Sequence, residues 1–156
     1  HMGLFDKKNP ASAEIAKVAA LLKEATPDVE WVEDGPGNWG TRNNSVLVKV
    51  LVDVSNPDIP LVNVVAFTLM NFKEDMAIYK YLFMEVIPFI ARWEIEEDDE
   101  GTLSLFLVQK LLIEDLDASE LTAAIYSVAL TADELDEDLQ KRFGGKRCQD
   151  AFEWTD

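Results

Sequence analysis

Residues 45–54 have the sequence SVLVKVLVDV, and this stretch decides the fold class. Valine occupies every second position from 46 to 54, and side chains two residues apart in a β-strand point to the same face. The opposite face mixes leucine with charge, at Leu47, Lys49, Leu51 and Asp53. The pattern therefore predicts a strand with one fully apolar face, which packs in a core, and one mixed face.

The next stretch predicts an antiparallel partner for this strand. Residues 55–58, SNPD, are typical turn residues and end the first strand. Residues 61–70, LVNVVAFTLM, are rich in β-branched and apolar residues, so they predict a second strand. The connection between the two is short, as in a hairpin.

Shorter extended patterns lie on either side of this pair. Residues 29–34, VEWVED, predict a short strand, and Trp39 is expected beyond a glycine-rich turn, in a loop or a short edge segment. Residues 92–97 alternate apolar and charged side chains. Residues 98–101, DDEG, predict a tight connection to a long strand at residues 102–113.

Three segments predict helices. Residues 11–25 place apolar side chains at steps of three and four, which is one face of a helix. Residues 75–90 are apolar nearly all round, so we expect this helix to be buried on more than one side. Residues 118–143 carry one continuous apolar stripe, and Asp117 with Glu120 predicts a capping box at their start.

The order of elements is α-β-β-β-α-β-β-α, which favours an α+β fold. We expect a twisted antiparallel sheet of about five strands packed by three helices. Residues 1–10 are interpreted as a flexible lead-in, with a cloning scar at His1. A single domain is expected at residues 11–145, followed by a C-terminal tail at residues 146–156.

Charge excludes some partners. The chain has 156 residues, of which 30 are acidic and 14 basic, so its formal net charge is −16. Nucleic acid and anionic lipid repel such a polyanion, so we expect neither nucleic acid nor a membrane as a partner. No stretch has the pattern of a signal peptide or a membrane-spanning helix, and we expect a cytoplasmic protein.

Histidine and cysteine are too few for several kinds of chemistry. The only histidine is His1, within the scar, so we expect no histidine-based nucleophile or metal site. Cys148 is the only cysteine, which excludes an internal disulfide and a zinc cage. We expect a tail thiol without a role. The alternative is a reactive thiol, whose pKa the neighbouring Lys146 and Arg147 would lower.

Two stretches are candidates for ligand sites, and neither has a complete motif. Residues 96–100, EEDDE, precede Gly101 as in a calcium-binding loop, but Leu107 stands where a bidentate glutamate is needed. Residues 35–40, GPGNWG, are rich in glycine but lack the lysine of a phosphate-binding loop. We therefore predict no metal, no cofactor and no catalytic residue, and we interpret the acidic run as a solvated turn.

Three stretches carry a resemblance to a known family. They are residues 46–57 (VLVKVLVDVSNP) with Leu61, residues 93–113 leading to Asp115-Leu116-Asp117 and Glu120-Leu121, and residues 132–145 (ADELDEDLQKRFGG). In this order they resemble the YbjN-like, type III secretion chaperone-like family, in the form of its small stand-alone bacterial members. The resemblance covers residues 13–145. Residues 88–92 depart from it, because they lack the polar, asparagine-bearing turn expected after the central helix.

The resemblance implies a secretion-chaperone-like fold, with helices on one face of a twisted antiparallel sheet and often a dimer. It implies protein binding and carries over no catalytic residue. It does not imply that this protein serves a secretion apparatus.

The predicted strands have apolar residues on both faces, and three helices cover only one face easily. Leaving a large apolar side chain in water costs about 1.5–3 kcal/mol relative to burial. We therefore expect the second face to meet a protein client of unknown identity or a second copy, with a homodimer favoured; the alternative is that the C-terminal tail covers it. The candidate partner-binding residues are Trp39, Leu47, Leu51, Phe67, Trp93, Phe106 and Val108.

The favoured function is a non-catalytic protein-binding module, chaperone-like or regulatory, that acts as a homodimer on a protein client. The alternative is an acidic decoy that binds a basic nucleic-acid-binding protein, which the charge of −16 motivates. A carboxylate-only hydrolase is a more remote alternative, because nothing in the sequence singles out one pair among the 30 acids.

Overall fold

The computed structural model of the chain describes residues 11–152. The expected lead-in with its scar, and the last four residues of the expected tail, lie outside the described residues. In chain order the elements are α1 (Ala11–Ala25), β1 (Val32–Glu33), β2 (Asn38–Asn43), β3 (Val46–Asp53), β4 (Leu61–Phe72), α2 (Met76–Lys80), the π-helical turn η1 (Tyr81–Glu85), β5 (Arg92–Glu97), β6 (Leu103–Leu112), α3 (Ala118–Phe143) and α4 (Cys148–Ala151).

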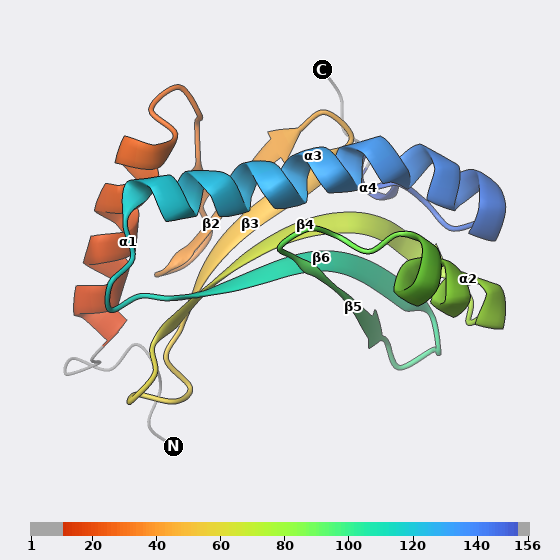
Figure 1. Cartoon of the computed structure of the whole chain (residues 1–156), viewed down its shortest axis with the longest axis horizontal. Coiled ribbons are helices and arrows are strands. Elements are labelled where there is room, and N and C mark those ends of the chain that lie inside the picture. Colours follow the sequence, from red (N-terminus) through yellow and green to blue (C-terminus); the bar gives the residue numbers. More distant parts are fainter. Residues whose placement is uncertain (1–10, 153–156) are drawn as a thin grey trace.

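One antiparallel sheet organises the molecule. Its strand order is β1-β2-β3-β4-β6-β5, and all neighbouring pairs are antiparallel. Helices α1 and α3 lie on one side, and the sheet arches away from α3; among residues 11–152 no helix covers its other side (Figure 1). The predicted α+β class, with a twisted antiparallel sheet, is confirmed.

The sheet has six strands, one more than expected, because residues 38–43, expected to form a loop or a short edge segment, pair with β3 as a full strand. The turn before them needs glycine, since Gly37 has a φ of 74° and a Cβ there would lie 3.0 Å from Cγ1 of Ile15 on α1. The Val52 N–H donates to the Gly37 carbonyl at 2.9 Å, which ties this turn to β3. Trp39 therefore lies within a strand, opposite Val50.

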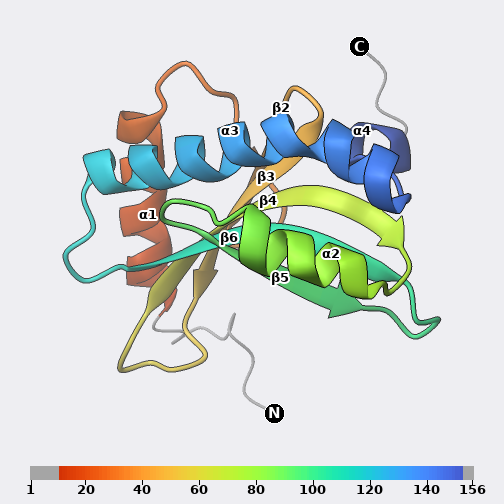
Figure 2. The same cartoon turned by 45° about the vertical axis from the view of Figure 1, so that its right-hand side comes forward.

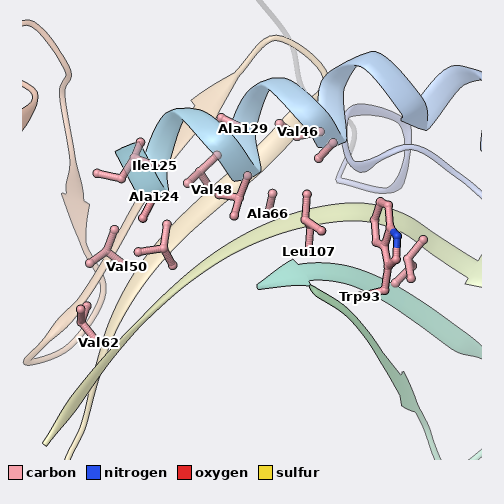
Figure 3. Packing of buried hydrophobic residues seen from close by; sticks show 14 of the residues in the cluster. Val46, Val48, Val50, Val62, Ala66, Trp93, Leu107, Ala124, Ile125 and Ala129 are labelled. Atoms are coloured by element: carbon pink, nitrogen blue, oxygen red, sulfur yellow. The ribbon is translucent and has the colours of Figure 1, made fainter. Parts of the chain in front are cut away.

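The valine face of β3 forms the centre of the core. Val46, Val48 and Val50 are fully buried and lie under α3, where Figure 3 shows them beside Ala124, Ile125 and Ala129. Small residues on α3 let its axis approach the sheet closely. The predicted apolar stripe and its direction toward the strands are thus confirmed.

Helix α3 begins and ends as its sequence predicts. The Asp117 carboxylate accepts a hydrogen bond from the Glu120 N–H at 2.8 Å, and the Glu120 carboxylate accepts one from the Asp117 N–H at 3.2 Å. This is the capping box. At the other end Gly144 adopts a φ of 79°, which side chains other than glycine rarely tolerate.

The segment predicted as one buried helix at residues 75–90 is shorter and more exposed than expected, so that prediction is wrong. Regular helix stops at Lys80, and the Val86 N–H donates to the Tyr81 carbonyl across a wider π-helical turn. Pro88 supplies no N–H to continue the ladder. Because α2 lies beside the β5–β6 end of the sheet (Figure 2), only one of its sides meets the core.

Residues 146–152, expected to belong to a tail, pack against the ends of β3 and β4. The backbones of Lys146 and Met70 exchange two hydrogen bonds of 2.7 Å, and the Gln149 N–H donates to the Ser45 carbonyl at 3.2 Å. Cys148 is fully buried, and burial raises the pKa of its thiol to about 12. The alternative of a thiol activated by its basic neighbours is therefore wrong.

A polar cluster fixes the second half of α3 to the β2–β3 turn. Asp133 accepts hydrogen bonds from the Ser45 hydroxyl at 2.7 Å and from Asn44 Nδ2 at 2.9 Å. Asp136, which is 1% exposed, contacts the same Ser45 hydroxyl. The Ser45 hydroxyl is the donor in both contacts, so the two carboxylates share its one proton. Burial raises the pKa of Asp136, and the hydrogen bond from Ser45 offsets only part of that shift.

Candidate protein-binding surfaces

The side of the sheet that the helices leave uncovered, here called the open face, carries an apolar cluster of its own. Val65, Phe106 and Val108 form a buried group that is separate from the main core, and Leu51 and Phe67 pack against it half-buried. The rings of Phe67 and Phe106 meet edge to face, with centroids 4.9 Å apart. The open face therefore presents apolar side chains over its centre.

Strand register places these side chains in adjacent rows, because residues opposite one another in an antiparallel pair share a face. One row, from β2 to β5, is Arg42, Leu47, Phe67, Phe106 and Glu94. The next row is Gly40, Lys49, Val65, Val108 and Arg92. Apolar residues occupy β4 and β6 in both rows and β3 in the first row, and charged residues lie toward the edges.

The apolar centre of the open face is hollowed. A hollow of about 350 Å³ lies over β3, β4, β6 and β5, and its floor is the Phe67–Phe106 pair with its valine neighbours. Glu94, Glu96 and Lys110 stand at its margin. A wider hollow of about 900 Å³ lies over β1, β2 and β3 on the same face and includes Leu47. Together the two hollows extend across the width of the sheet.

Charge on the open face differs from charge on the whole chain. Strand positions on this face carry four basic residues, Arg42, Lys49, Arg92 and Lys110. They carry three acidic residues, Asp53, Glu94 and Glu96. The net charge of −16 therefore arises elsewhere, and the open face is close to neutral.

The structure brings five of the seven predicted partner-binding residues together on the open face. They are Leu47, Leu51, Phe67, Phe106 and Val108. The other two face the helices: Trp39 is 6% exposed and Trp93 is 7% exposed, both within the main core. The Trp93 indole N–H donates to the Val86 carbonyl at 3.0 Å, which fixes the connection before β5. Neither tryptophan is available to a partner on the open face.

A second apolar surface was not anticipated from the sequence. We call it the α2–η1 patch, and it consists of Met76, Phe83, Met84, Ile87, Phe89 and Ile90, all exposed. Phe89 alone is 86% exposed. Beside it a hollow of about 520 Å³ lies between Phe89, Ile90 and the outer side of α3 near Leu130. In the sequence this patch corresponds to residues 75–90, which are apolar nearly all round. That pattern predicts a helix buried within its own domain, and it does not predict an exposed surface.

Two further observations concern the described residues as a set. Within 11–152, no three acidic, cysteine or histidine side chains gather as a metal site requires. None of the helices in that part of the chain has the length and apolarity to cross a bilayer.

An antiparallel sheet with helices on one face, and apolar residues left open on the other, defines an α+β protein of the secretion-chaperone type. Residues 14–151 match the family model described as T3SS (YopN, CesT) and YbjN peptide-binding chaperone 1. The chain belongs to this family, which confirms the resemblance seen in its sequence.

Comparison with solved structures supports the same fold. A chain from the structure titled "Structure of the HopA1-SchA Chaperone-Effector Complex" superposes with a TM-score of 0.55 at 12% sequence identity. The match covers 82% of this chain and 99% of that one. At this identity the likeness is one of fold. A search of curated proteins found no match.

Proposed function

We propose that this protein is a non-catalytic, cytoplasmic chaperone that holds an apolar segment of a client protein on its open face, as a homodimer. The observation that carries the proposal is the apolar cluster of the open face, because its residues contribute nothing to the main core. Membership of a family described as peptide-binding chaperones supports it.

The open face suits a peptide better than a small molecule. Its hollows are shallow and extend over several strands, instead of converging on a few polar groups. A client side chain that covers Leu51 or Phe67 removes half-exposed apolar surface from water. Burying one large apolar side chain stabilises a complex by about 1.5–3 kcal/mol before the cost of association.

The α2–η1 patch is the surface proposed for the second copy. Two chains of charge −16 repel each other over most of their surface. Residues 76–91 contain one basic and one acidic side chain, Lys80 and Glu85, so this segment is neutral. It is also where large apolar side chains are most exposed, and monomeric proteins rarely leave such a contiguous patch uncovered.

Client retention tests the proposal. Tagged wild-type protein and the double variant Leu51→Glu/Phe67→Glu serve as baits in lysate of the native host, and Ile59→Glu is the matched control. Ile59 is an exposed apolar residue in the β3–β4 loop, so its variant introduces one glutamate away from the open face, against two on the open face in the double variant. All three should melt cooperatively by circular dichroism.

We expect one protein to be retained by the wild type and by Ile59→Glu, and lost with the double variant. Equal retention by all three baits would contradict a client site on the open face.

The acidic-decoy alternative does not fit the open face. A basic partner requires a continuous acidic surface, whereas the strand positions of the open face hold four basic and three acidic residues. Client binding should therefore depend only weakly on salt concentration if apolar contacts dominate it.

A further inference from the structure

We propose that residues 28–34, here called the β1 segment, form a movable wall of the client site, which swings away from β2 to admit a bulky apolar side chain of the client. The inference rests on the proposed function, because it concerns which client side chains the site accepts. It is carried by hollows on both sides of the segment, by the weak pairing that holds it, and by a glycine hinge at its end.

The β1 segment separates two hollows. On the open face, the wider hollow of about 900 Å³ takes six of its eleven lining residues from this segment. On the helix side, a hollow of about 350 Å³ lies between α1 and β2, and its lining includes Leu22 and Trp39. Val29 and Glu33 line both hollows. The segment is therefore the wall between them, and its removal would join the two hollows into one.

The backbone pairing that holds the wall to the sheet is short. β1 makes two residue pairs with β2, which are Val32 with Gly40 and Glu33 with Trp39. Every other neighbouring pair of strands in the sheet has at least six. Both residues of β1 are exposed, Val32 at 66%. A short ladder with little buried surface opens locally at a lower free-energy cost than the core of the sheet.

Charge adds little to this attachment. The β1 segment, DVEWVED, contains four acidic residues and no basic one. Among residues 11–152 a single ion pair joins it to the sheet, between Lys49 Nζ and the Asp34 carboxylate at 3.9 Å. The Asp34 side chain is 82% exposed, and such a pair stabilises a structure only weakly. The acidic residues of the segment also repel one another and a chain whose net charge is −16.

Two glycines at the end of the segment define where it turns. At Gly37 the chain is fixed, because a Cβ there would lie 3.0 Å from Ile15 and the Val52 N–H donates to its carbonyl at 2.9 Å. At Gly35, which has a φ of 85°, a Cβ would have no described atom within 4 Å. Glycine in open space absorbs changes of φ and ψ at low cost. Gly35 is therefore the hinge, and Gly37 is the fixed point beyond it.

One side chain latches the wall in its closed position. Trp31 packs half-buried against the main core, and its indole N–H donates to Oγ1 of Thr26 at 2.9 Å. Thr26 is buried, and its hydroxyl donates to the Leu22 carbonyl at 2.8 Å, so the acceptor is fixed in place. Opening withdraws the Trp31 ring from the space beside Leu22 and Trp39. A bulky apolar side chain of the client takes the place of that ring and offsets the loss of its burial.

A reversible cross-link tests the movement. Val32→Cys/Gly40→Cys places cysteines at opposite positions of β1 and β2. Cα atoms of such a pair lie about 4.5–5.5 Å apart, which a disulfide spans. Gly40 accepts a side chain, because a Cβ there would have its nearest neighbour at 3.8 Å. Cys148 is fully buried, so the two added thiols are the accessible ones.

Hydrogen exchange, followed by mass spectrometry, is measured on the full-length wild type and on the cross-linked variant before and after reduction. In the wild type we expect the amides of residues 29–33 to exchange at least about 100-fold faster than those of β3. Oxidation of the variant should slow this exchange, and reduction should restore it. Trp31→Phe removes the latch hydrogen bond and should speed it about fivefold.

Client retention from lysate of the native host tests what the movement serves. We expect the client to be retained by the wild type and by the reduced cysteine variant, and to be lost from the oxidised variant. Both cysteines remain in place after reduction, so recovery separates closure of the wall from the bulk of the added side chains.

A second variant tests the space behind the wall. Ala19 lines the hollow on the helix side, so Ala19→Phe places a ring where the client side chain would enter. Ala20→Phe is the matched control, because it makes the same change at an exposed position of α1. We expect Ala19→Phe to lose the client and Ala20→Phe to retain it, with cooperative melts by circular dichroism for both.

Four results would overturn the proposal. Exchange of residues 29–33 as slow as that of β3 means that the wall does not move. Equal retention by the oxidised and reduced variants means that its movement does not serve the client, and retention by Ala19→Phe removes the space behind it as the client's place. These three leave the proposed function standing. Failure of every bait, the wild type included, to retain a client removes the proposed function and this role of the wall with it.

Discussion

Helix α3 and the α2–η1 segment are both rich in apolar residues, yet the first is packed and the second is largely exposed. On α3 the apolar residues form a stripe, with Leu121, Val128 and Leu139 fully buried against the sheet. Around α2 and η1 they point in all directions, and only Ile78, Tyr81 and Leu82 are buried. Amphipathic spacing therefore indicates a helix that packs against the core of its own chain. A segment that is apolar on all sides does not indicate whether its own fold or another protein covers it.

Two leucines on α3 give the sharpest version of this comparison and the largest expected effect. Leu121 is fully buried and Leu130 is 51% exposed on the same helix. We expect Leu121→Ala to lower the free energy of unfolding by about 3 kcal/mol, because it opens a cavity in the core. Leu130→Ala should change it by less than about 0.5 kcal/mol. Urea unfolding of both variants, at protein concentrations too low for dimers to form, measures the two changes in unfolding free energy. Equal losses of unfolding free energy would contradict the contrast between packed and exposed apolar residues.

The helix caps provide a smaller contrast. Asp117 caps α3 and Asp75 caps α2, each through its carboxylate. Asp117→Ala should cost about 1 kcal/mol of unfolding free energy, since the capped helix is part of the core. Asp75→Ala should cost clearly less, because α2 has five residues and meets the core on one side only. A larger loss for Asp75→Ala in chemical unfolding would show that α2 is more integral to the fold than its exposure indicates.

The polar cluster that secures α3 predicts a pH dependence, the smallest of the three effects. Burial raises the pKa of Asp136 above its unfolded value, so its contribution to stability is present at low pH and declines as pH rises through the folded pKa. Asp136→Asn cannot ionise and its amide can still donate to Ser45. We therefore expect this variant to gain stability relative to the wild type as pH rises.

Asp133 should behave in the opposite way. Burial alone would raise its pKa, but hydrogen bonds from Ser45 and Asn44 outweigh burial, and the pKa is lowered. Its contribution is present above the unfolded pKa and lost as pH falls through the folded one, so Asp133→Asn should destabilise the protein most near neutral pH. Thermal melts across the pH range check both variants. Parallel profiles for the two would contradict the opposite pKa shifts of Asp133 and Asp136.

Local sequence patterns predicted the elements whose structure depends on residues close together in the sequence. The valine alternation of β3 and the capping box of α3 are rules of period and hydrogen bonding that act within a few residues, and both were confirmed. The sequence left Trp39 in a loop or a short edge segment, because its strand depends on a glycine turn beneath α1, a long-range contact. The burial of Cys148 was not predicted for a similar reason, since it comes from the pairing of Lys146 with Met70.

The candidate site was only partly predictable. Alternation placed Leu47, Leu51, Phe67, Phe106 and Val108 on faces of strands, and their meeting on one open face followed from strand order. Trp39 and Trp93 lie on the face that the helices cover. Predicting this requires the register of β2 and β5, which the periodicity of the sequence does not give. The α2–η1 patch was missed because composition does not distinguish a core from an interface.

Mass in solution tests the central claim, that the exposed α2–η1 patch is a protein interface. Light scattering on a sizing column should give the wild type twice the 17.6 kDa of the chain. Ile87→Glu/Phe89→Glu should give 17.6 kDa with an unchanged circular dichroism spectrum, while Ile59→Glu, in the β3–β4 loop, should remain a dimer. A wild-type protein that stays at 17.6 kDa at high concentration, or a double variant that remains dimeric, would contradict the account.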